Sequence, residues 1–280
     1  MNSGNRISWD AAQRVAQQLA PEIATSSSVV ISSANGWVVK FSGAKRDYIF
    51  KLSPAPHDFD VGPTPQYTQI QTELYTLARL GDTYAARIRG VLVTEELSAE
   101  VLKWTPGRSL SSHLGGALSG AQSAEVMVLY EGARAILHSL HSKDCIHGDI
   151  QPSHVRISNP SQDAWPELID FGLAGPSGTK FGGGMIHFLS PTAAETLLRD
   201  GHIIRKDAID RFALAASFAT ALTGGWVYDY SSRGLTDSQL KPGNRSAKLR
   251  AIALGPPISA IEALQESGLA EIANDLEEMA

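Results

Sequence analysis

The sequence predicts an α+β protein in which a small β-rich half precedes a larger helical half. Between residues 28 and 104, most segments are rich in β-branched and aromatic residues, which favour strands. After Pro106-Gly107, apolar residues recur at helical spacing instead. We therefore expect the boundary between the halves near Lys103–Gly107. The chain has 280 residues, of which 43% are hydrophobic, and this is enough for a large core.

The β-rich half is expected to contain two helices as well as its strands. A first helix should cover residues 8–19, where apolar residues follow helical spacing and Ser8 or Asp10 can cap the first turn. Strand composition then appears in residues 28–32, 36–41, 47–52, 88–96 and 98–104. A second helix is expected at about 67–81, with an apolar face made of Ile70, Leu74, Leu77 and Leu80.

The helical half is expected to be built mainly from four helices. Helical periodicity covers residues 121–142, 191–200, 206–223 and 259–279. The chain has no internal repeat and no low-complexity linker, so we expect a single domain.

The densest set of polar motifs lies in residues 140–175. It contains His147-Gly148-Asp149 and, further along, Asp170-Phe171-Gly172. Two loop aspartates suit phosphoryl transfer, because one carboxylate can orient an acceptor hydroxyl and accept its proton while another holds Mg²⁺ on a triphosphate. Asp149 and Asp170 are the candidates for these two roles.

These motifs resemble those of the protein kinase superfamily. The segment from His147 to His154 resembles the catalytic loop H-R-D-L-K-P-x-N, and Asp170-Phe171-Gly172 matches D-F-G. The form H-G-D is common in some bacterial kinase domains and in small-molecule phosphotransferases, including, more distantly, the aminoglycoside phosphotransferases. The resemblance implies a two-lobed, protein-kinase-like fold. It implies an N-terminal helical extension, a β-rich N-lobe and a helical C-lobe over residues 1–27, 28–102 and 103–280.

The resemblance also implies a site for ATP and Mg²⁺. Lys51 would pair with the α- and β-phosphates, and Glu73 would hold that lysine in place; Lys40 is a rival that lies one strand too early. Asp170 and His154 are the candidate metal ligands. The remaining candidate nucleotide-binding residues are Gly36, Val38, Val101, Lys103, Trp104, Gln151 and His154. Asp210 would brace the backbone of the catalytic loop.

Four departures from the family pattern weaken the expectation of catalytic activity. Ile31 and Ser33 occupy two glycine positions of the phosphate-binding loop, where side chains would crowd the backbone amides. His154 replaces an asparagine, and imidazole is a poor ligand for Mg²⁺. Gln151 replaces a lysine that faces the γ-phosphate. Gly148 replaces an arginine that would pair with a phosphorylated activation segment, so that switch is not expected.

The expected function is therefore ATP-dependent transfer of the γ-phosphoryl group to a hydroxyl. Ser190-Pro191 and Asp210 favour Ser or Thr of a protein or peptide as the acceptor, by analogy with the family. Three alternatives are open: a pseudokinase that binds nucleotide or scaffolds partners, a small-molecule hydroxyl kinase, and an enzyme that transfers another part of the nucleotide. His138, His141, His147, His154 and Cys145 match no zinc-site spacing.

Net charge and cysteine content limit the kinds of partner and the cellular compartment that we expect. A formal net charge of −5 gives no overall attraction to nucleic acid, so no nucleic-acid partner is expected. The single cysteine, Cys145, allows no intrachain disulfide, which suits a reducing cytoplasm. The chain has no signal-peptide pattern and no apolar run of about 18 residues, so we expect no membrane insertion.

Overall fold

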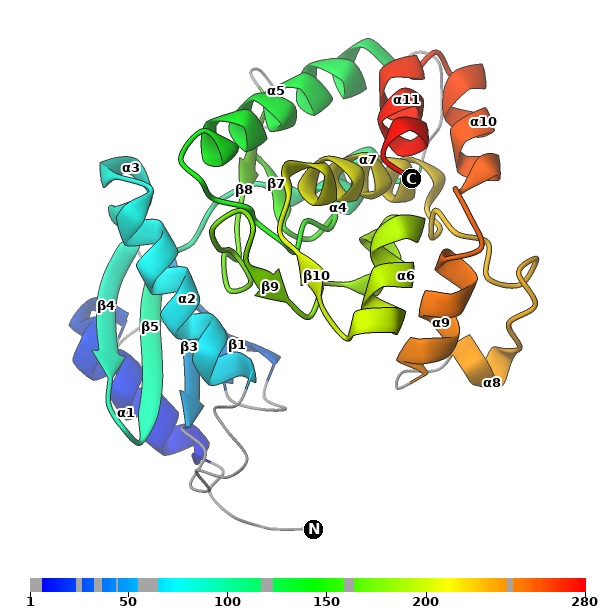
Figure 1. The fold of residues 1–280 in the computed structure, drawn as a ribbon. Coiled ribbons are helices and arrows are strands. Elements are labelled where there is room, and N and C mark those ends of the chain that lie inside the picture. The colour runs from blue at the N-terminus through cyan, green and yellow to red at the C-terminus, as the bar shows by residue number, and fades with distance from the viewer. Residues whose placement is uncertain are drawn as a thin grey trace. The chain divides into compact units, whose positions relative to one another are not determined.

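A computed structural model describes residues 7–23, 27–32, 37–43, 45–54, 65–116, 123–158, 164–240 and 244–280 (Figure 1). The fold is of the α+β type, as the sequence predicts. The chain forms two compact units. Unit 1 consists of Met1–Trp104 and Phe171–Leu173, and unit 2 consists of Thr105–Asp170 and Ala174–Ala280. Among the described residues, no helix is long and apolar enough to cross a membrane.

Unit 1 is built on a five-stranded antiparallel sheet with the order β1-β2-β3-β5-β4. Its strands are β1 (Ser27–Ser32), β2 (Trp37–Ser42), β3 (Asp47–Pro54), β4 (Ile88–Val93) and β5 (Leu97–Lys103). All five expected strands are present, with ends that differ by a few residues. The strand expected to reach residue 96 stops earlier, because Thr94 N donates to Leu97 O and turns the chain directly into β5.

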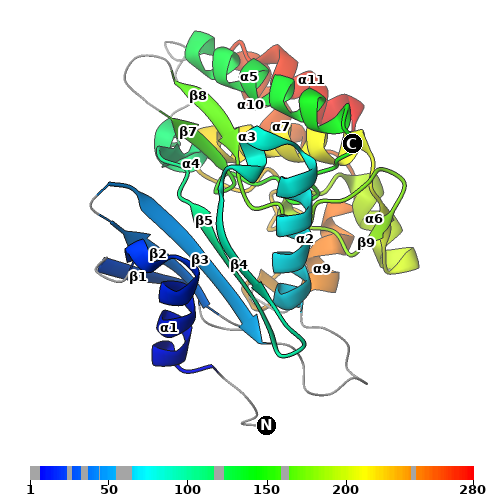
Figure 2. The same cartoon turned by 90° about the vertical axis from the view of Figure 1, so that its left-hand side faces the viewer.

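Helices cover both faces of this sheet (Figures 1 and 2). The expected first helix is α1 (Trp9–Leu19), and Ala11 N donates to the capping hydroxyl of Ser8. Its buried residues Ala12 and Ala16 pack into the cluster that contains Phe50 and Val101. The expected second helix is α2 (Pro65–Arg79), which begins slightly earlier than predicted and packs against β3 and β5. Because both faces are covered, nearly all of β5 is buried.

Unit 1 also contains two short elements that the sequence does not announce. The 3₁₀ helix η1 (Pro21–Ile23) follows α1, and α3 (Asp82–Ala85) follows α2. Both are only a single turn long, too short to show a periodic apolar pattern.

Unit 2 is organised around α7 (Asp207–Thr223), most of whose residues are buried. Helices α5 (Ser123–His141), α4 (Leu110–Leu114) and α11 (Ala270–Glu278) pack against it. The remaining helical elements are α6 (Pro191–Asp200), α8 (Asp237–Leu240), α9 (Arg245–Ile252), α10 (Ile258–Glu266) and the 3₁₀ helix η3 (Ile186–Phe188). Two small sheets complete the unit: β6 (Arg108–Ser109), β7 (Val155–Ser158) and β8 (Trp165–Leu168), and β9 (Lys180–Phe181) with β10 (Ile203–Ile204).

Three of the four helices expected in this half are confirmed, and the fourth prediction is wrong. Residues 259–279 form α10 and α11 instead of one helix. The chain breaks at Ser267-Gly268, where Gly268 has a φ of +73°. That left-handed conformation ends α10 and favours glycine, which has no Cβ.

Candidate active site

In unit 1, Lys51 and Glu73 meet on the face of the sheet that α2 covers. Lys51 lies on β3 and its ammonium forms an ion pair with Glu73 Oε2, as the family resemblance implies. Glu73 is only 1% exposed. A second buried carboxylate, Glu100 on the neighbouring β5, has its Oε1 3.9 Å from Lys51 Nζ. The Lys51 ammonium therefore lies next to two buried carboxylates, with the closer contact to Glu73.

The other oxygen of Glu73 reaches the segment that carries the D-F-G motif. Phe171 N donates to Glu73 Oε1 at 3.2 Å. The Phe171 ring is fully buried and packs edge-on against Tyr84, with ring centroids 5.8 Å apart. Glu73 therefore fixes two things at once: the phosphate-binding candidate Lys51, and the residue that directly follows Asp170 in the chain.

In unit 2, Asp210 supports the loop that contains Asp149. This aspartate lies in the first turn of α7 and is fully buried. His147 N donates to its Oδ2 at 2.7 Å and Gly148 N donates to its Oδ1 at 2.8 Å. His141 Nε2 donates to Oδ2 as well, at 2.9 Å. The predicted bracing role of Asp210 is confirmed by these contacts.

The conformation of the same loop explains the glycine of H-G-D. Gly148 has a φ of +77°, in the left-handed region where a Cβ is costly. His147, beside it, is fully buried, and one ring nitrogen, Nε2, lies 3.1 Å from Ile169 O. Burial lowers the pKa of His147, and the negative charge of Asp210 opposes this shift. His147 is therefore a neutral packing residue.

Asp149 is held by a segment that the sequence did not connect with it. Met185 N donates to Asp149 Oδ1 at 2.7 Å. A Cβ added to Gly184 would collide with that same oxygen and with the Gly148 carbonyl. Gln151 Nε2 lies 3.4 Å from Asp149 Oδ2, the oxygen that Met185 leaves open. The side chain of Asp149 is 17% exposed.

His154 lies between the two candidate catalytic carboxylates. Its Nδ1 donates to the Asp149 carbonyl at 2.8 Å and lies 3.6 Å from Asp149 Oδ2. Its Nε2 is 3.5 Å from Asp170 Oδ2 and 3.1 Å from Gln151 Nε2. With the proton on Nδ1, Nε2 accepts from the Gln151 amide. The structure thus brings together Asp149, Gln151, His154 and Asp170.

Asp170 is the most accessible of these groups. Its side chain is 41% exposed, and its φ of +65° is unusual for a residue other than glycine. Strained backbone of this kind is concentrated at functional sites. The next residue in the chain, Phe171, donates its backbone N–H to Glu73.

The potential metal ligands around Asp170 are its own carboxylate oxygens and the nearby His154 Nε2. Among the described residues, no three His, Cys, Asp or Glu side chains are arranged to hold a metal by themselves. Mg²⁺ does not need such a cage, because it is usually bound through one or two carboxylates together with substrate phosphates and water. The accessible oxygens of Asp170 fit that mode. His154 would add a nitrogen, which Mg²⁺ accepts poorly.

Three of the remaining candidate nucleotide contacts, Val38, Val101 and Lys103, lie on strands of unit 1, and Trp104 directly follows β5. Val38 pairs with Lys51 across β2 and β3. The Val101 side chain is fully buried in the core. Lys103 N donates to Arg87 O at 2.7 Å, and Trp104 N donates to Asp47 O at 3.0 Å. Gly36 lies outside the described residues.

Trp104 and the rival lysine, Lys40, are engaged with each other. The Lys40 ammonium lies 4.6 Å from the centroid of the Trp104 ring and 2.6 Å from Asp47 Oδ2. A cation over an aromatic face is a stabilising contact in its own right. Trp104 therefore packs against Lys40. Lys51 is the lysine that forms an ion pair with a glutamate on a helix.

Comparison with known proteins gives no independent assignment. No protein-family model matches the chain, and no curated protein matches it. The geometry of the site therefore carries the functional argument alone.

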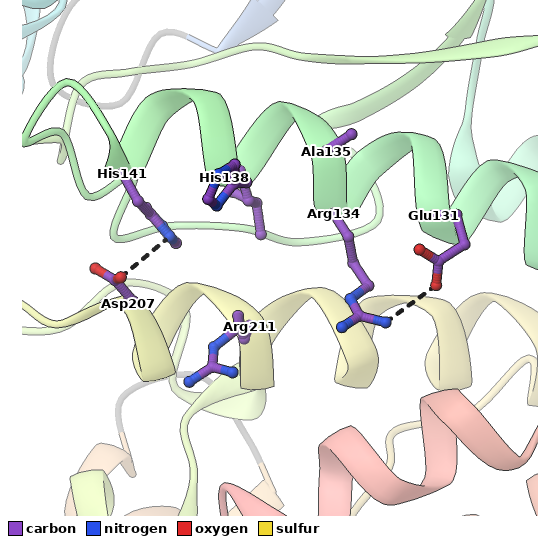
Figure 3. A pocket seen from close by; sticks show the side chains of 8 residues that line it. Glu131, Arg134, Ala135, His138, His141, Asp207 and Arg211 are labelled. Atoms are coloured by element: carbon purple, nitrogen blue, oxygen red, sulfur yellow. Dashed lines mark hydrogen bonds and ion pairs between the residues drawn. The ribbon is translucent and has the colours of Figure 1, made fainter.

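Unit 2 also contains a cavity of about 560 Å³ in which none of the sequence-predicted site residues takes part (Figure 3). Its lining comes from α5 and α7: Glu131, Arg134, Ala135, Leu137, His138, His141, Asp207 and Arg211. Arg134 pairs with Glu131 at 3.0 Å, and His141 Nδ1 lies 3.7 Å from Asp207 Oδ2. Of these residues, His141 also contacts Asp210, so the cavity lies beside the support of the Asp149 loop and not at Asp149 itself.

Proposed function

We propose that this protein is an ATP-dependent phosphotransferase of the protein-kinase-like class. It transfers the γ-phosphoryl group to a hydroxyl, most suitably Ser or Thr of a protein or peptide. In this proposal, units 1 and 2 are the N-lobe and C-lobe of a protein-kinase-like fold. We also infer a bacterial, cytoplasmic protein, because H-G-D resembles bacterial kinase domains and a single cysteine, Cys145, allows no intrachain disulfide.

The observation that carries the proposal is the double role of Glu73. One of its oxygens holds Lys51 and the other accepts from Phe171 N. A buried glutamate is costly unless every lone pair is used well. A purely structural ion pair between Lys51 and Glu73 would not require a contact between Glu73 and Phe171. The presence of this contact supports the proposal that Glu73 positions both the phosphate-binding lysine and the segment that follows the metal-binding aspartate.

Each residue of the proposed site can be assigned a role in the transfer reaction. The acceptor oxygen forms a bond to the γ-phosphorus, the bond from that phosphorus to the β–γ bridging oxygen breaks, and ADP leaves. Asp149 Oδ2 orients the acceptor hydroxyl and takes its proton. Lys51 neutralises the phosphates that depart. Mg²⁺, when bound at Asp170, supplies charge neutralisation on the triphosphate.

One observation favours the pseudokinase alternative. Met185 N occupies Asp149 Oδ1, and Gly184 lies directly against the same carboxylate. If this cover persists when nucleotide is bound, an acceptor hydroxyl has only the Oδ2 side of Asp149. A protein with this arrangement would bind nucleotide without efficient transfer.

Calorimetric titration of ATP, with and without Mg²⁺, tests the proposal. We expect Mg²⁺-dependent binding that Asp170→Ala abolishes. The matched control is Asp200→Ala, since Asp200 is an exposed aspartate of unit 2 that pairs with Arg199. No binding at millimolar nucleotide would contradict the proposal.

Mass spectrometry of acceptors then separates the enzyme from the pseudokinase. Asp149→Asn should lower transfer by about 10²-fold or more while ATP still binds. Equal product from the Asp149→Asn variant and the wild type would exclude Asp149 as the base. Product mass also tests the alternative chemistry, because transfer of a nucleotidyl group adds a larger mass than transfer of a phosphoryl group.

A further inference from the structure

The acceptor side of Asp149 is formed by a segment that has almost no side chains. Residues 182–184 are three consecutive glycines, and the next residue, Met185, donates its amide to Asp149. A Cβ added to Gly182 would have no described atom within 4 Å. Open space beside exposed backbone suits an extended peptide, which can approach closely and exchange main-chain hydrogen bonds.

Positive charge gathers along this segment from helix α9. Arg245 Nη2 donates to Gly182 O at 2.6 Å, which ties the start of α9 to the glycines. Lys248, one turn further on, forms no hydrogen bond or ion pair through its ammonium with the described residues. Its charge is felt at His187, whose pKa is lowered to about 4 first by burial and then by Lys248. Helix α9 also packs against η3, which contains His187.

Acidic residues are absent from both partners of this contact. Residues 176–189 contain no Asp or Glu, and neither does α9. The whole chain, in contrast, has a net charge of −5. A local positive surface on an acidic protein, next to the candidate base, favours acceptors that bring their own negative charge.

We propose that Arg245 and Lys248 select an acidic peptide, in which the acceptor Ser or Thr is flanked by Asp or Glu, and that this peptide lies along Gly182–Gly184. The inference rests on the proposed phosphotransferase function and names its substrate class. A nucleic acid fits less well, since two cations on a chain of net negative charge give little of the phosphate neutralisation that such binding needs.

Fluorescence anisotropy on the full-length protein tests the surface without any need for catalysis. The probes are a labelled peptide with one serine between glutamates, and the same peptide with lysines in place of the glutamates. We expect the acidic peptide to bind at least roughly tenfold more tightly. Lys248→Glu should weaken acidic-peptide binding by about fivefold, because it replaces an attraction by a repulsion.

Arg250→Glu is the matched control. Arg250 lies on the same helix and is exposed, but it falls on the side of α9 away from Arg245 and Lys248, as the helical spacing requires. We expect it to leave peptide binding unchanged. Arg245→Glu provides a second variant, with thermal unfolding to show that the fold is intact. Equal affinity for both peptides, an equal loss with Arg250→Glu, or tighter binding of an oligonucleotide would overturn the inference.

The outcomes of this test and of the functional test are separable. Binding of the acidic peptide that depends on Lys248, without any transfer, would support the surface and contradict the kinase. Efficient transfer to neutral or basic peptides would support the kinase and overturn the acidic acceptor.

Discussion

The Asp210 side chain accepts hydrogen bonds from three groups around the Asp149 loop: His147 N, Gly148 N and His141 Nε2. Replacing it by alanine would leave two buried backbone amides, of His147 and Gly148, without their acceptor. Each buried donor without a partner costs about 1–3 kcal/mol. We expect Asp210→Ala to lower the free energy of unfolding by about 3 kcal/mol, as measured in urea.

Asp207→Ala is the control for that measurement. Asp207 lies one turn earlier on the same helix, is exposed, and comes no closer than 3.7 Å to His141. Its loss should change the free energy of unfolding by less than about 0.5 kcal/mol. Similar effects from both variants would mean that the amides of the Asp149 loop find another acceptor.

His187 should make stability depend on pH. Its Nδ1 lies 2.6 Å from Tyr230 Oη and its ring stacks on Trp226, with centroids 4.0 Å apart. Burial lowers its pKa to about 4, below the value of about 6.5 expected in the unfolded chain. The unfolded state therefore binds the proton first, and stability falls as the pH drops from about 6.5 towards 4.

The contribution of His187 is measured by comparing how the free energy of unfolding changes with pH in the wild type and in a variant. His187→Phe keeps a ring against Trp226 but cannot titrate. Its free energy of unfolding should fall less than that of the wild type between pH 7 and pH 4, by about 1–2 kcal/mol once solvent screening is included. Parallel pH profiles for the two proteins would show that His187 does not contribute.

At the scale of elements, α1 and β4 meet at Gly90. A Cβ at this position would lie 2.5 Å from Leu19 O and 2.8 Å from Leu19 Cβ. The backbone of α1 cannot yield easily, so Gly90→Ala should destabilise the protein by about 1–3 kcal/mol, seen as a lower Tm. Val91→Ala, at an adjacent position that is 46% exposed, should cost much less. A neutral Gly90→Ala would mean that α1 is free to move away from β4.

Long elements were predictable from the sequence, and short ones were not. The strands of unit 1 and helices α1, α2, α5, α6 and α7 follow clear patterns of apolar spacing. Strands β6, β9 and β10 have two residues each, too few to show any period. Helix α9 was missed because it carries three cations in eight residues, and only packing against α6 and η3 makes it stable.

The candidate site was likewise predictable from the sequence only in part. The motifs around Asp149 and Asp170 predicted which residues come together, because the loop between them is short and its partners are local. The contact of Gly184 and Met185 with Asp149 was not predictable, because it joins segments 35 or more positions apart through backbone atoms. The run of glycines at 182–184 was the available signal, since glycine permits the closest approach of two chains.

At the scale of the whole molecule, the chain passes from unit 2 to unit 1 between Asp170 and Phe171. Two adjacent residues therefore contact side chains of different units. Phe171 N donates to Glu73 of unit 1, and Asp170 Oδ2 lies near His154 Nε2 of unit 2. If the protein binds Mg²⁺-ATP as proposed, its affinity should depend on Lys51, the proposed phosphate-binding cation, and on Asp170, the proposed metal-binding carboxylate.

The decisive comparison is between the two lysines of the sheet. Lys51→Met should weaken ATP binding at least tenfold with or without Mg²⁺, because it removes the cation that faces the phosphates. Lys40→Met should leave the affinity unchanged, since Lys40 is occupied by Asp47 and Trp104. Asp170→Ala should matter only when Mg²⁺ is present. Calorimetry on the three variants should give this pattern of ATP affinities, which a single structural defect would not produce. A larger loss of affinity from Lys40→Met than from Lys51→Met would show that Lys40 is the phosphate-binding lysine.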